Sequence, residues 1–230
     1  MKKILLVIDV QNEFITNVRC GKLVYDIRDF IVNADLDYVI GAYYKNGSGN
    51  TLNWKVTGNR LYTTKIHKDL VKYCDVMFGH SEYNCLSNSR FLEAMKAFND
   101  GEIPEEVYLC GLDTDACVYE TAIALYEIGI KPILIRDLCF SSGGFKYHEA
   151  ALMLFKRNIS SALIKDSYEL LDNKINSLKD LRIGLGMSQV RFANEMGMSL
   201  SYIQKVEQGY KKPTDEVYLK IINRLIRINR

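Results

Sequence analysis

Short apolar runs alternate with longer segments of helical periodicity over residues 1 to about 170. The runs are rich in Val, Ile, Leu and Tyr, and turn residues bound them, as is typical of buried strands. The expected strands are Ile4–Asp9, Tyr38–Tyr44, Asp75–Phe78, Val107–Leu112, Ile133–Asp137 and Ala162–Ile164. The expected helices include Phe91–Asn99, Asp115–Ile128 with a stop at Gly129, and His148–Arg157. This alternation predicts an α/β, Rossmann-like fold, a mostly parallel sheet with helices on both faces.

The pattern changes near residue 173, where the strand signals stop and only helical segments remain. Two of these helices are expected on either side of a tight turn at Gly197, and Ser188 and Ser199 are suited to cap their first turns. We therefore predict two domains, residues 1–173 and residues 174–230. The second is expected to be a small all-α helix-turn-helix domain.

Composition and charge narrow the possible functions. Of the 230 residues, 48% are hydrophobic, enough for a sizeable core and a small second domain. The net charge is only +2, but residues 174–230 carry eleven basic and five acidic residues, whereas residues 1–173 carry nineteen and twenty-three. The basic end favours a polyanionic partner, although a solvated basic surface explains the charge equally well.

The start of the chain and the cysteines are typical of a cytoplasmic protein. The first apolar run ends at Asp9 and is too short for an export signal or a membrane span. The six cysteines lie far apart and form no C-x-x-C pair, so neither disulfides nor structural zinc is expected. We expect no cofactor and no membrane association, and most of the cysteines should be small buried hydrophobes.

Two segments carry candidate chemistry. Asp9 follows the first expected strand, at the edge where open parallel sheets hold their binding crevice, although such an Asp taken alone is more often structural. Cys117 lies on the first turn of the expected helix after Val107–Leu112, and Asp115 or Thr114 can cap that helix. A helix start lowers the pKa of a thiol and offers N–H donors to an oxyanion. We therefore expect Cys117 to be a reactive thiol.

These segments resemble the isochorismatase-like cysteine hydrolases across about residues 1–170. Three ordered motifs carry the resemblance: Gly111–Val118 matches a Gly-x-x-Thr-Asp-x-Cys-Val signature, Asp9, Gln11 and Phe14 match Asp-x-Gln-x-x-Phe, and Asp137–Ser141 with His148–Leu152 looks like the family's later strand end and helix. The resemblance implies a Rossmann-like fold and a covalent thioester mechanism, in which an Asp, a Lys and a Cys converge at the strand ends.

The resemblance also implies roles for single residues. Asp9 would be the general base and Cys117 the nucleophile. Backbone N–H groups around Thr114 and Cys117 would form an oxyanion hole, with a cis peptide near Leu112 and Asp113. In this chain His80 stands where the family usually has its lysine. A protonated imidazole would supply a cation and move a proton, whereas a neutral one would not stabilise a thiolate by charge.

Other interpretations of the third position stay open. His80 is also compatible with a loop histidine in a domain that catalyses little. A shifted alignment would instead bring one of three lysines to the site, namely Lys65, Lys68 or Lys72. The family's zinc-dependent branch has an Asp-x-His-x-x-His cluster, but the histidines here are widely spaced, so no metal is expected. Trp54, in the expected loop Lys45–Gly58, is a candidate pocket wall or a core residue.

The end of the chain resembles the lambda-repressor/Cro-like family across about residues 176–228. The resemblance rests on the Ala before the turn, an Ile-x-x-x-Glu-x-Gly ending after it, and Lys211-Lys212-Pro213 beyond. It implies that the helix after Gly197 enters the major groove of double-stranded DNA, usually as part of a dimer. Carried over by position, Leu200, Ser201 and Lys205 would face bases, and Gln189, Ser199, Tyr202 and Lys211 would hold phosphates. A helix-turn-helix retained for protein contact is the alternative.

Three functions are compatible with these observations. The first is a C–N hydrolase acting on a small amide or ester through a covalent Cys intermediate and carrying a DNA-binding domain. The second is a transcriptional regulator whose hydrolase-like domain is an inactive ligand sensor and dimerisation module. The third is an isochorismate-type hydrolase, whose ether substrate does not require the cysteine. We favour the first, because Asp9 and the whole turn around Cys117 are present, and we expect a homodimer or higher homo-oligomer.

Overall fold

The computed structural model describes residues 2–47, 51–52, 65–171, 178–208, 210–211, 213–214, 217–218, 220–221 and 224. The chain divides into two compact units, Met1–Leu171 and Asp172–Arg230. Most of the loop expected at Lys45–Gly58, including Trp54, lies outside the described residues. Among the described residues, no helix is both long and apolar enough to cross a membrane.

The first unit is built on a six-stranded sheet, and the strand pairs are all parallel. Its order is β3-β2-β1-β4-β5-β6, the order of a doubly wound Rossmann-like sheet. The strands are β1 (Ile4–Ile8), β2 (Tyr38–Tyr44), β3 (Val76–His80), β4 (Glu106–Gly111), β5 (Lys131–Cys139) and β6 (Ile164–Lys165). The predicted α/β fold is confirmed.

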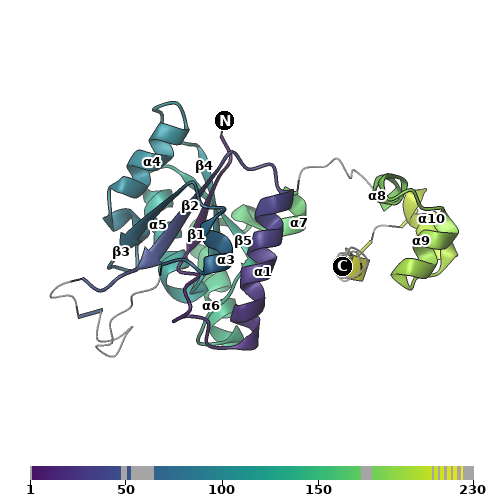
Figure 1. Ribbon diagram of the computed structural model, residues 1–230, viewed down its shortest axis with the longest axis horizontal. Coiled ribbons are helices and arrows are strands. Elements are labelled where there is room, and N and C mark those ends of the chain that lie inside the picture. The colour runs from purple at the N-terminus through teal and green to yellow at the C-terminus, as the bar shows by residue number, and fades with distance from the viewer. Residues whose placement is uncertain are drawn as a thin grey trace. The chain divides into compact units, whose positions relative to one another are not determined.

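Helices cover both faces of this sheet, α1 and α3 on one face and α4 and α5 on the other (Figure 1). The α-helices whose bounds are described in this unit are α1 (Val18–Asn33), α3 (Lys68–Val71), α4 (Arg90–Phe98), α5 (Tyr119–Glu127), α6 (Phe145–Phe155) and α7 (Ser167–Leu170). Short 3-10 turns lie at η1 (Cys85–Ser87) and η4 (Ser161–Leu163), and π-helical turns at η2 (Thr114–Val118) and η3 (Lys156–Ser160). The central strand β1 is buried along its whole length, so both layers of helices share one continuous core.

Several elements differ from the sequence prediction. Helix α1 was not predicted, although its buried Leu23, Val24, Ile27 and Phe30 recur at helical spacing. Strand β3 extends two residues beyond the predicted end, so that His80 is its last residue and not part of a loop. The predicted helix Asp115–Ile128 begins instead with the π-helical turn η2.

The second unit has its own small core, formed by Leu178, Met187, Phe192, Ala193, Met196, Ile203 and Ile221. Its main helices are α8 (Leu178–Gly184), α9 (Gln189–Met196) and α10 (Leu200–Glu207). Ser188 and Ser199 cap α9 and α10 as predicted, each side chain accepting a hydrogen bond from the backbone three residues on. Gly197 adopts φ 62°, which lets the chain turn tightly between the two helices.

Candidate active site and DNA-binding surface

The candidate active site lies where the strand order of the sheet reverses, between β1 and β4. In open parallel sheets a crevice forms at this switch point, beyond the carboxyl ends of the strands. Asp9 directly follows β1, and the turn that leads to Cys117 follows β4. The two strands approach closely at Gly111, where an added Cβ would lie 2.0 Å from the Ile8 carbonyl oxygen. Only glycine fits there, so the signature glycine brings the turn next to Asp9.

Asp9 is 1% exposed and adopts φ 52°, a left-handed conformation that few residues other than glycine take. Its backbone N–H donates to the Ala42 carbonyl (2.9 Å), and its own carbonyl accepts from Gln11 (2.7 Å). The Gln11 side chain in turn bonds both the N–H and the carbonyl of Tyr44. The ends of β1 and β2 therefore hold the Asp9 backbone in a strained conformation, as is common at functional sites.

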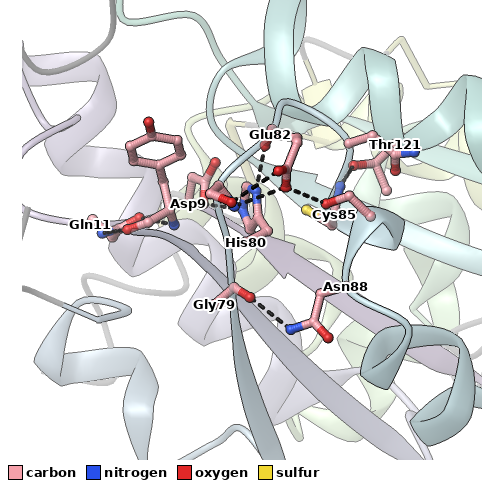
Figure 2. A network of polar contacts seen from close by, with 12 residues as sticks. Asp9, Gln11, Gly79, His80, Glu82, Cys85, Asn88 and Thr121 are labelled. Carbon is pink, nitrogen blue, oxygen red and sulfur yellow. Dashed lines mark hydrogen bonds and ion pairs between the residues drawn. The ribbon is translucent and has the colours of Figure 1, made fainter. Parts of the chain in front are cut away.

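His80 is the partner of the Asp9 carboxyl group. It is 1% exposed, and its Nε2 lies 2.9 Å from Asp9 Oδ1 (Figure 2). Its Nδ1 lies 2.7 Å from the Glu82 carbonyl oxygen. Because a carbonyl oxygen only accepts, Nδ1 must carry a proton. The pair then holds its other proton either on Nε2, as an imidazolium facing a carboxylate, or on Asp9.

Electrostatics favour the imidazolium form. Burial alone lowers the pKa of the His80 imidazole, but its interactions with Cys85 and Asp9 outweigh burial and raise this pKa above its ordinary value. The second carboxylate oxygen, Asp9 Oδ2, is buried and has no hydrogen-bond partner among the described residues. His80 thus neutralises the charge of Asp9 and occupies one oxygen, while the other remains an acceptor.

Cys117 adjoins this pair, but its electrostatics differ from the prediction. The thiol is 7% exposed and lies on the π-helical turn η2. Burial, and then the negative charge of Asp9, raise its pKa well above the ordinary value of a thiol. The expectation that a helix start lowers this pKa is wrong for the resting state, because burial and the neighbouring carboxylate dominate. Cys117 is therefore a neutral thiol beside a carboxylate, and its activation requires a base.

Three residues at this site were not singled out from the sequence: Cys85, Tyr44 and Tyr83. Cys85 is fully buried, interacts with both His80 and Cys117, and donates its N–H to Thr121 Oγ1 (3.0 Å). Burial raises the pKa of Tyr44 to about 12 and also raises that of Tyr83. The proximity of Cys117 raises both pKa values further. No motif identifies them, because each reaches the thiol only through folding of the chain around the crevice.

The loop after β3 fixes the orientation of His80. Asn88 donates to the Gly79 carbonyl (2.8 Å), and the Glu82 carboxylate accepts from Ser87 Oγ (2.7 Å) and from Ser81 (Figure 2). The Glu82 carbonyl that meets His80 is thereby held in place. This loop supplies the second imidazole contact, so the protonation of His80 depends on residues outside the family motifs.

The turn before Cys117 contains a cis peptide bond between Leu112 and Asp113. The Thr114 N–H donates to the Phe140 carbonyl (3.0 Å) and is not available to a substrate in this conformation, which corrects its expected place in an oxyanion hole. The N–H groups of Asp113 and Cys117 donate to no acceptor outside their own helical turn among the described residues. Of the expected groups, these two remain candidates for binding an oxyanion.

No lysine replaces His80 in the described structure. Lys65, Lys68 and Lys72 are all exposed, and none of them contacts Asp9 or Cys117. Among the described residues, no group of three His, Cys, Asp or Glu side chains is arranged to hold a metal ion. The candidate site therefore consists of Asp9, His80 and Cys117, and no contact of a lysine ammonium with Asp9 or Cys117 is seen among the described residues.

In the second unit, the residues expected to contact DNA fall into two groups. Ser199, Leu200, Ser201, Lys205 and Lys211 are all exposed, at the N-cap of α10, on the helix or just beyond its end. This placement suits a recognition helix, whose exposed first turns meet the bases. Lys211 Nζ lies 4.9 Å from the centre of the Tyr202 ring, so the aromatic ring supports the cation.

Gln189 and Tyr202 are placed differently from the expectation. Gln189 Nε2 donates to Glu207 Oε2 (2.8 Å), in a network where Glu207 also pairs with the Arg182 guanidinium (2.6 and 3.0 Å). The Tyr202 hydroxyl is buried and has no partner among the described residues. In this conformation the Tyr202 hydroxyl is buried and is not presented to a phosphate, whereas the ring lies next to Lys211.

Comparisons with known proteins agree with both halves of this description. Residues 3–163 match the model of the isochorismatase domain, and residues 178–226 match that of a helix-turn-helix. A search of curated proteins gives no significant match.

Solved structures share the fold of the first unit. The nicotinamidase/pyrazinamidase PncA of Bacillus subtilis is 22% identical, with a TM-score of 0.53 over 72% of this chain and 100% of its own. An isochorismatase-like hydrolase from Alkaliphilus metalliredigens is 16% identical, with a TM-score of 0.59 over 74% and 97%. A putative isochorismatase from Burkholderia xenovorans is 16% identical, with a TM-score of 0.57 over 81% and 89%.

Proposed function

The chain belongs to the isochorismatase domain family and carries a C-terminal helix-turn-helix, and from this premise we propose that its first unit is a cysteine hydrolase. It cleaves a small amide or ester through a thioester on Cys117. One observation carries the proposal: the buried Asp9 carboxylate has one oxygen 2.9 Å from His80 Nε2, and its other oxygen has no other partner among the described residues and adjoins the neutral Cys117 thiol.

The acylation step uses Asp9 as the general base. Its free carboxylate oxygen takes the proton of the Cys117 thiol as the sulfur attacks the carbonyl carbon of the substrate. The C–S bond forms, and the carbonyl electron pair moves to the oxygen, which the N–H groups of Asp113 and Cys117 bind. Asp9 then gives its proton to the departing amine or alkoxide as the tetrahedral intermediate collapses to a thioester.

Hydrolysis of the thioester repeats the same transfers with water as nucleophile. Asp9 removes a proton from water as the water oxygen attacks the thioester carbon. The carbonyl electron pair again moves to the carbonyl oxygen, which becomes an oxyanion. Collapse breaks the C–S bond, releases the carboxylic acid, and returns the proton from Asp9 to the sulfur. His80 remains an imidazolium throughout, which keeps Asp9 Oδ1 occupied and compensates the carboxylate charge in a buried site.

The proposal is tested by trapping the acyl-enzyme. The full-length protein is incubated with a panel of small activated amides and esters, and adducts are mapped by mass spectrometry. We expect an acyl adduct on Cys117, lost in Cys117→Ala and retained in Cys20→Ala, which removes a buried cysteine at α1. If no analogue acylates Cys117 while DNA binding responds to a small ligand, the first unit is a ligand sensor and the hydrolase proposal is wrong.

We propose in addition that the helix-turn-helix binds double-stranded DNA through the exposed residues of α10, with the full chain acting as a homodimer. The excess of basic residues after residue 173 supports this, because phosphate contacts release counterions and give affinities that fall steeply with salt. Fluorescence anisotropy of the full chain on duplex DNA between about 50 and 200 mM salt tests the proposal. Undetectable or salt-insensitive binding would contradict it.

A further inference from the structure

A pocket of about 460 Å³ lies between α1, the end of β5 and α6, and neither Asp9 nor His80 lines it. Arg19 of α1, the end of β5 and the first turns of α6 line it, and Cys117 is not among its walls: the residues are Arg19, Arg136, Asp137, Cys139, Phe140, Phe145, His148 and Glu149. This volume is in the range of small-molecule sites. Nothing in the proposed hydrolysis uses these residues.

The unused hydrogen-bonding groups of this pocket are mainly donors. Arg19 is held by Asp26 Oδ2 and by the Asp137 carbonyl, both at 2.9 Å, and its remaining N–H groups have no acceptor among the described residues. The Asp137 carboxylate is already occupied by the N–H and hydroxyl of Ser167. Glu149 is exposed at the rim. An immobilised guanidinium with free donors is suited to a carboxylate.

Aromatic rings form the apolar part of the pocket. The Arg19 guanidinium carbon lies 5.8 Å from the centre of the Phe140 ring, and Phe145, 66% exposed, stands at the start of α6. The His148 ring lies between them, with centroid distances of 5.5 Å to Phe140 and 6.4 Å to Phe145. A flat ring can pack against these faces while a carboxylate attached to it meets Arg19.

His148 connects the pocket to the catalytic turn. It is 6% exposed, burial lowers its pKa, and it is therefore neutral. Its Nδ1 lies 2.8 Å from Thr114 Oγ1, while Nε2 has no hydrogen-bond partner among the described residues. Phe140, on the same pocket wall, accepts the Thr114 N–H. A ligand that moves His148 or Phe140 must therefore act on Thr114, which begins the turn that carries Cys117.

We propose that this pocket is a second small-molecule site that binds an aromatic monocarboxylate and alters the reactivity of Cys117 through His148 and Thr114. The hydrolysis proposed above releases a carboxylate, so the product of that reaction or a related acid has the required chemistry. Binding itself does not depend on hydrolysis. Failure of the hydrolase proposal and failure of this one are therefore separable.

Binding is tested by calorimetric titration of the full chain with benzoate. We expect saturable binding that Arg19→Gln weakens at least tenfold and that Cys117→Ala leaves unchanged. The matched control is Lys22→Gln, which removes another cation that pairs with Asp26 on the same helix but is absent from the pocket. Hydrogen exchange of α1 amides checks that both variants stay folded, and Phe140→Leu is a second variant should Arg19→Gln unfold.

Coupling is tested by the rate at which iodoacetamide alkylates Cys117, a measurement that needs no turnover. Benzoate should change this rate at least twofold, and Thr114→Val should remove the change while benzoate still binds. Three results would overturn the proposal: no binding of benzoate, equal binding of neutral benzamide, or binding lost on alkylation of Cys117 but unaffected by Arg19→Gln. The last result would place benzoate in the catalytic crevice.

Discussion

The two units of the chain arrange their functional residues in opposite ways. In the α/β unit, Asp9, His80 and Cys117 are nearly fully buried and come from the ends of different strands or from the turn after one. In the helix-turn-helix unit, the residues expected to meet DNA are mostly exposed along the single helix α10. A buried site depends on its non-local neighbours for its charge states, whereas an exposed helix depends mainly on its own caps and surface.

This difference is clearest in the protonation of the buried site. Cys117 has the sequence context of an activated thiol, yet burial and Asp9 raise its pKa. His80 is compatible from sequence with an ordinary loop histidine, yet Cys85 and Asp9 raise its pKa. Asp9, which contributes to both shifts, is distant in the chain from His80 and from Cys117. Lys205 and Ser201, in contrast, are exposed on α10.

Loss of the base should have the largest effect. We expect Asp9→Asn to reduce the rate of Cys117 acylation by about 100- to 10,000-fold, the range of a lost general base. The reason is that the neutral thiol then has no adjacent group to accept its proton. The measurement is the rate of adduct formation followed by mass spectrometry.

The control for this variant is Asp37→Asn, which removes a carboxylate that accepts a hydrogen bond from the Lys3 N–H (2.8 Å), near the start of β1. It should leave acylation near the wild-type rate. Equal losses in both variants would mean that the effect of Asp9→Asn is structural. Asp9 would then not act as a base.

The second-largest effect should be a loss of stability with rising pH in the α/β unit that the helix-turn-helix unit does not share. Because the folded pKa of His80 is raised, its contribution to stability is fully present below the unfolded pKa of about 6.5 and is lost as pH rises toward the folded pKa. His148, whose folded pKa is lowered by burial, has the opposite sign: its cost to stability disappears as pH rises through the unfolded pKa, so it adds little slope above about pH 7.5. We expect the α/β core to lose stability as pH rises from about 6.5 toward the folded pKa of His80 of about 12.

Hydrogen exchange of the β1 amides measures this loss, and His80→Gln should flatten it. All three histidines of the chain lie before residue 173, so the core of the helix-turn-helix should show no histidine-dependent change over the same range. An unchanged slope in His80→Gln would show that His80 does not carry the charge assigned to it.

Features that depend on neighbouring residues along the chain could be predicted from the sequence, whereas features that depend on distant segments could not. The parallel sheet, the caps at Ser188 and Ser199, and the exposed position of Lys205 follow from local patterns, and the structure agrees with them. Helix α1 was missed although its apolar spacing was readable. Its cap at Asn17, which accepts from the Cys20 N–H, was a further signal.

The remaining differences have no local signal. The Thr114 N–H donates to the carbonyl of Phe140, which directly follows β5. Cys85 comes close to His80 only because the loop after β3 turns back. The sequence pattern does not distinguish an α-helical start at Cys117 from the π-helical turn that the structure has there. Such features depend on which segments meet at the switch point of the sheet, and spacing along one segment does not encode them.

DNA binding should give an intermediate effect and separate two kinds of contact. We expect Lys205→Ala to cost about 1–3 kcal/mol at a preferred site and to relax its sequence preference, because an exposed lysine on α10 can reach guanine. Lys211→Ala should weaken all sequences similarly and lower the salt dependence. Fluorescence anisotropy on a selected site and on a random duplex measures both. Identical behaviour of the two variants would contradict the assignment of base and phosphate contacts.

The smallest effect should come from a helix cap, and it tests whether changes in the second unit stay local. Ser188 accepts a hydrogen bond from the Arg191 N–H (3.2 Å) at the start of α9. We expect Ser188→Ala to destabilise that helix by about 1 kcal/mol, measured by hydrogen exchange of α9 amides in the full chain, because one N–H of the first turn loses its acceptor. Ser188→Asn should retain most of the stability, since an Asn side chain supplies the same acceptor. Acylation of Cys117 should be unchanged in both variants, because Asp9, His80 and Cys117 all belong to the first unit. A change in the acylation rate in Ser188→Ala but not in Ser188→Asn would show that the stability of the helix-turn-helix is coupled to the hydrolase-like site, and the separation between the two units would then be wrong.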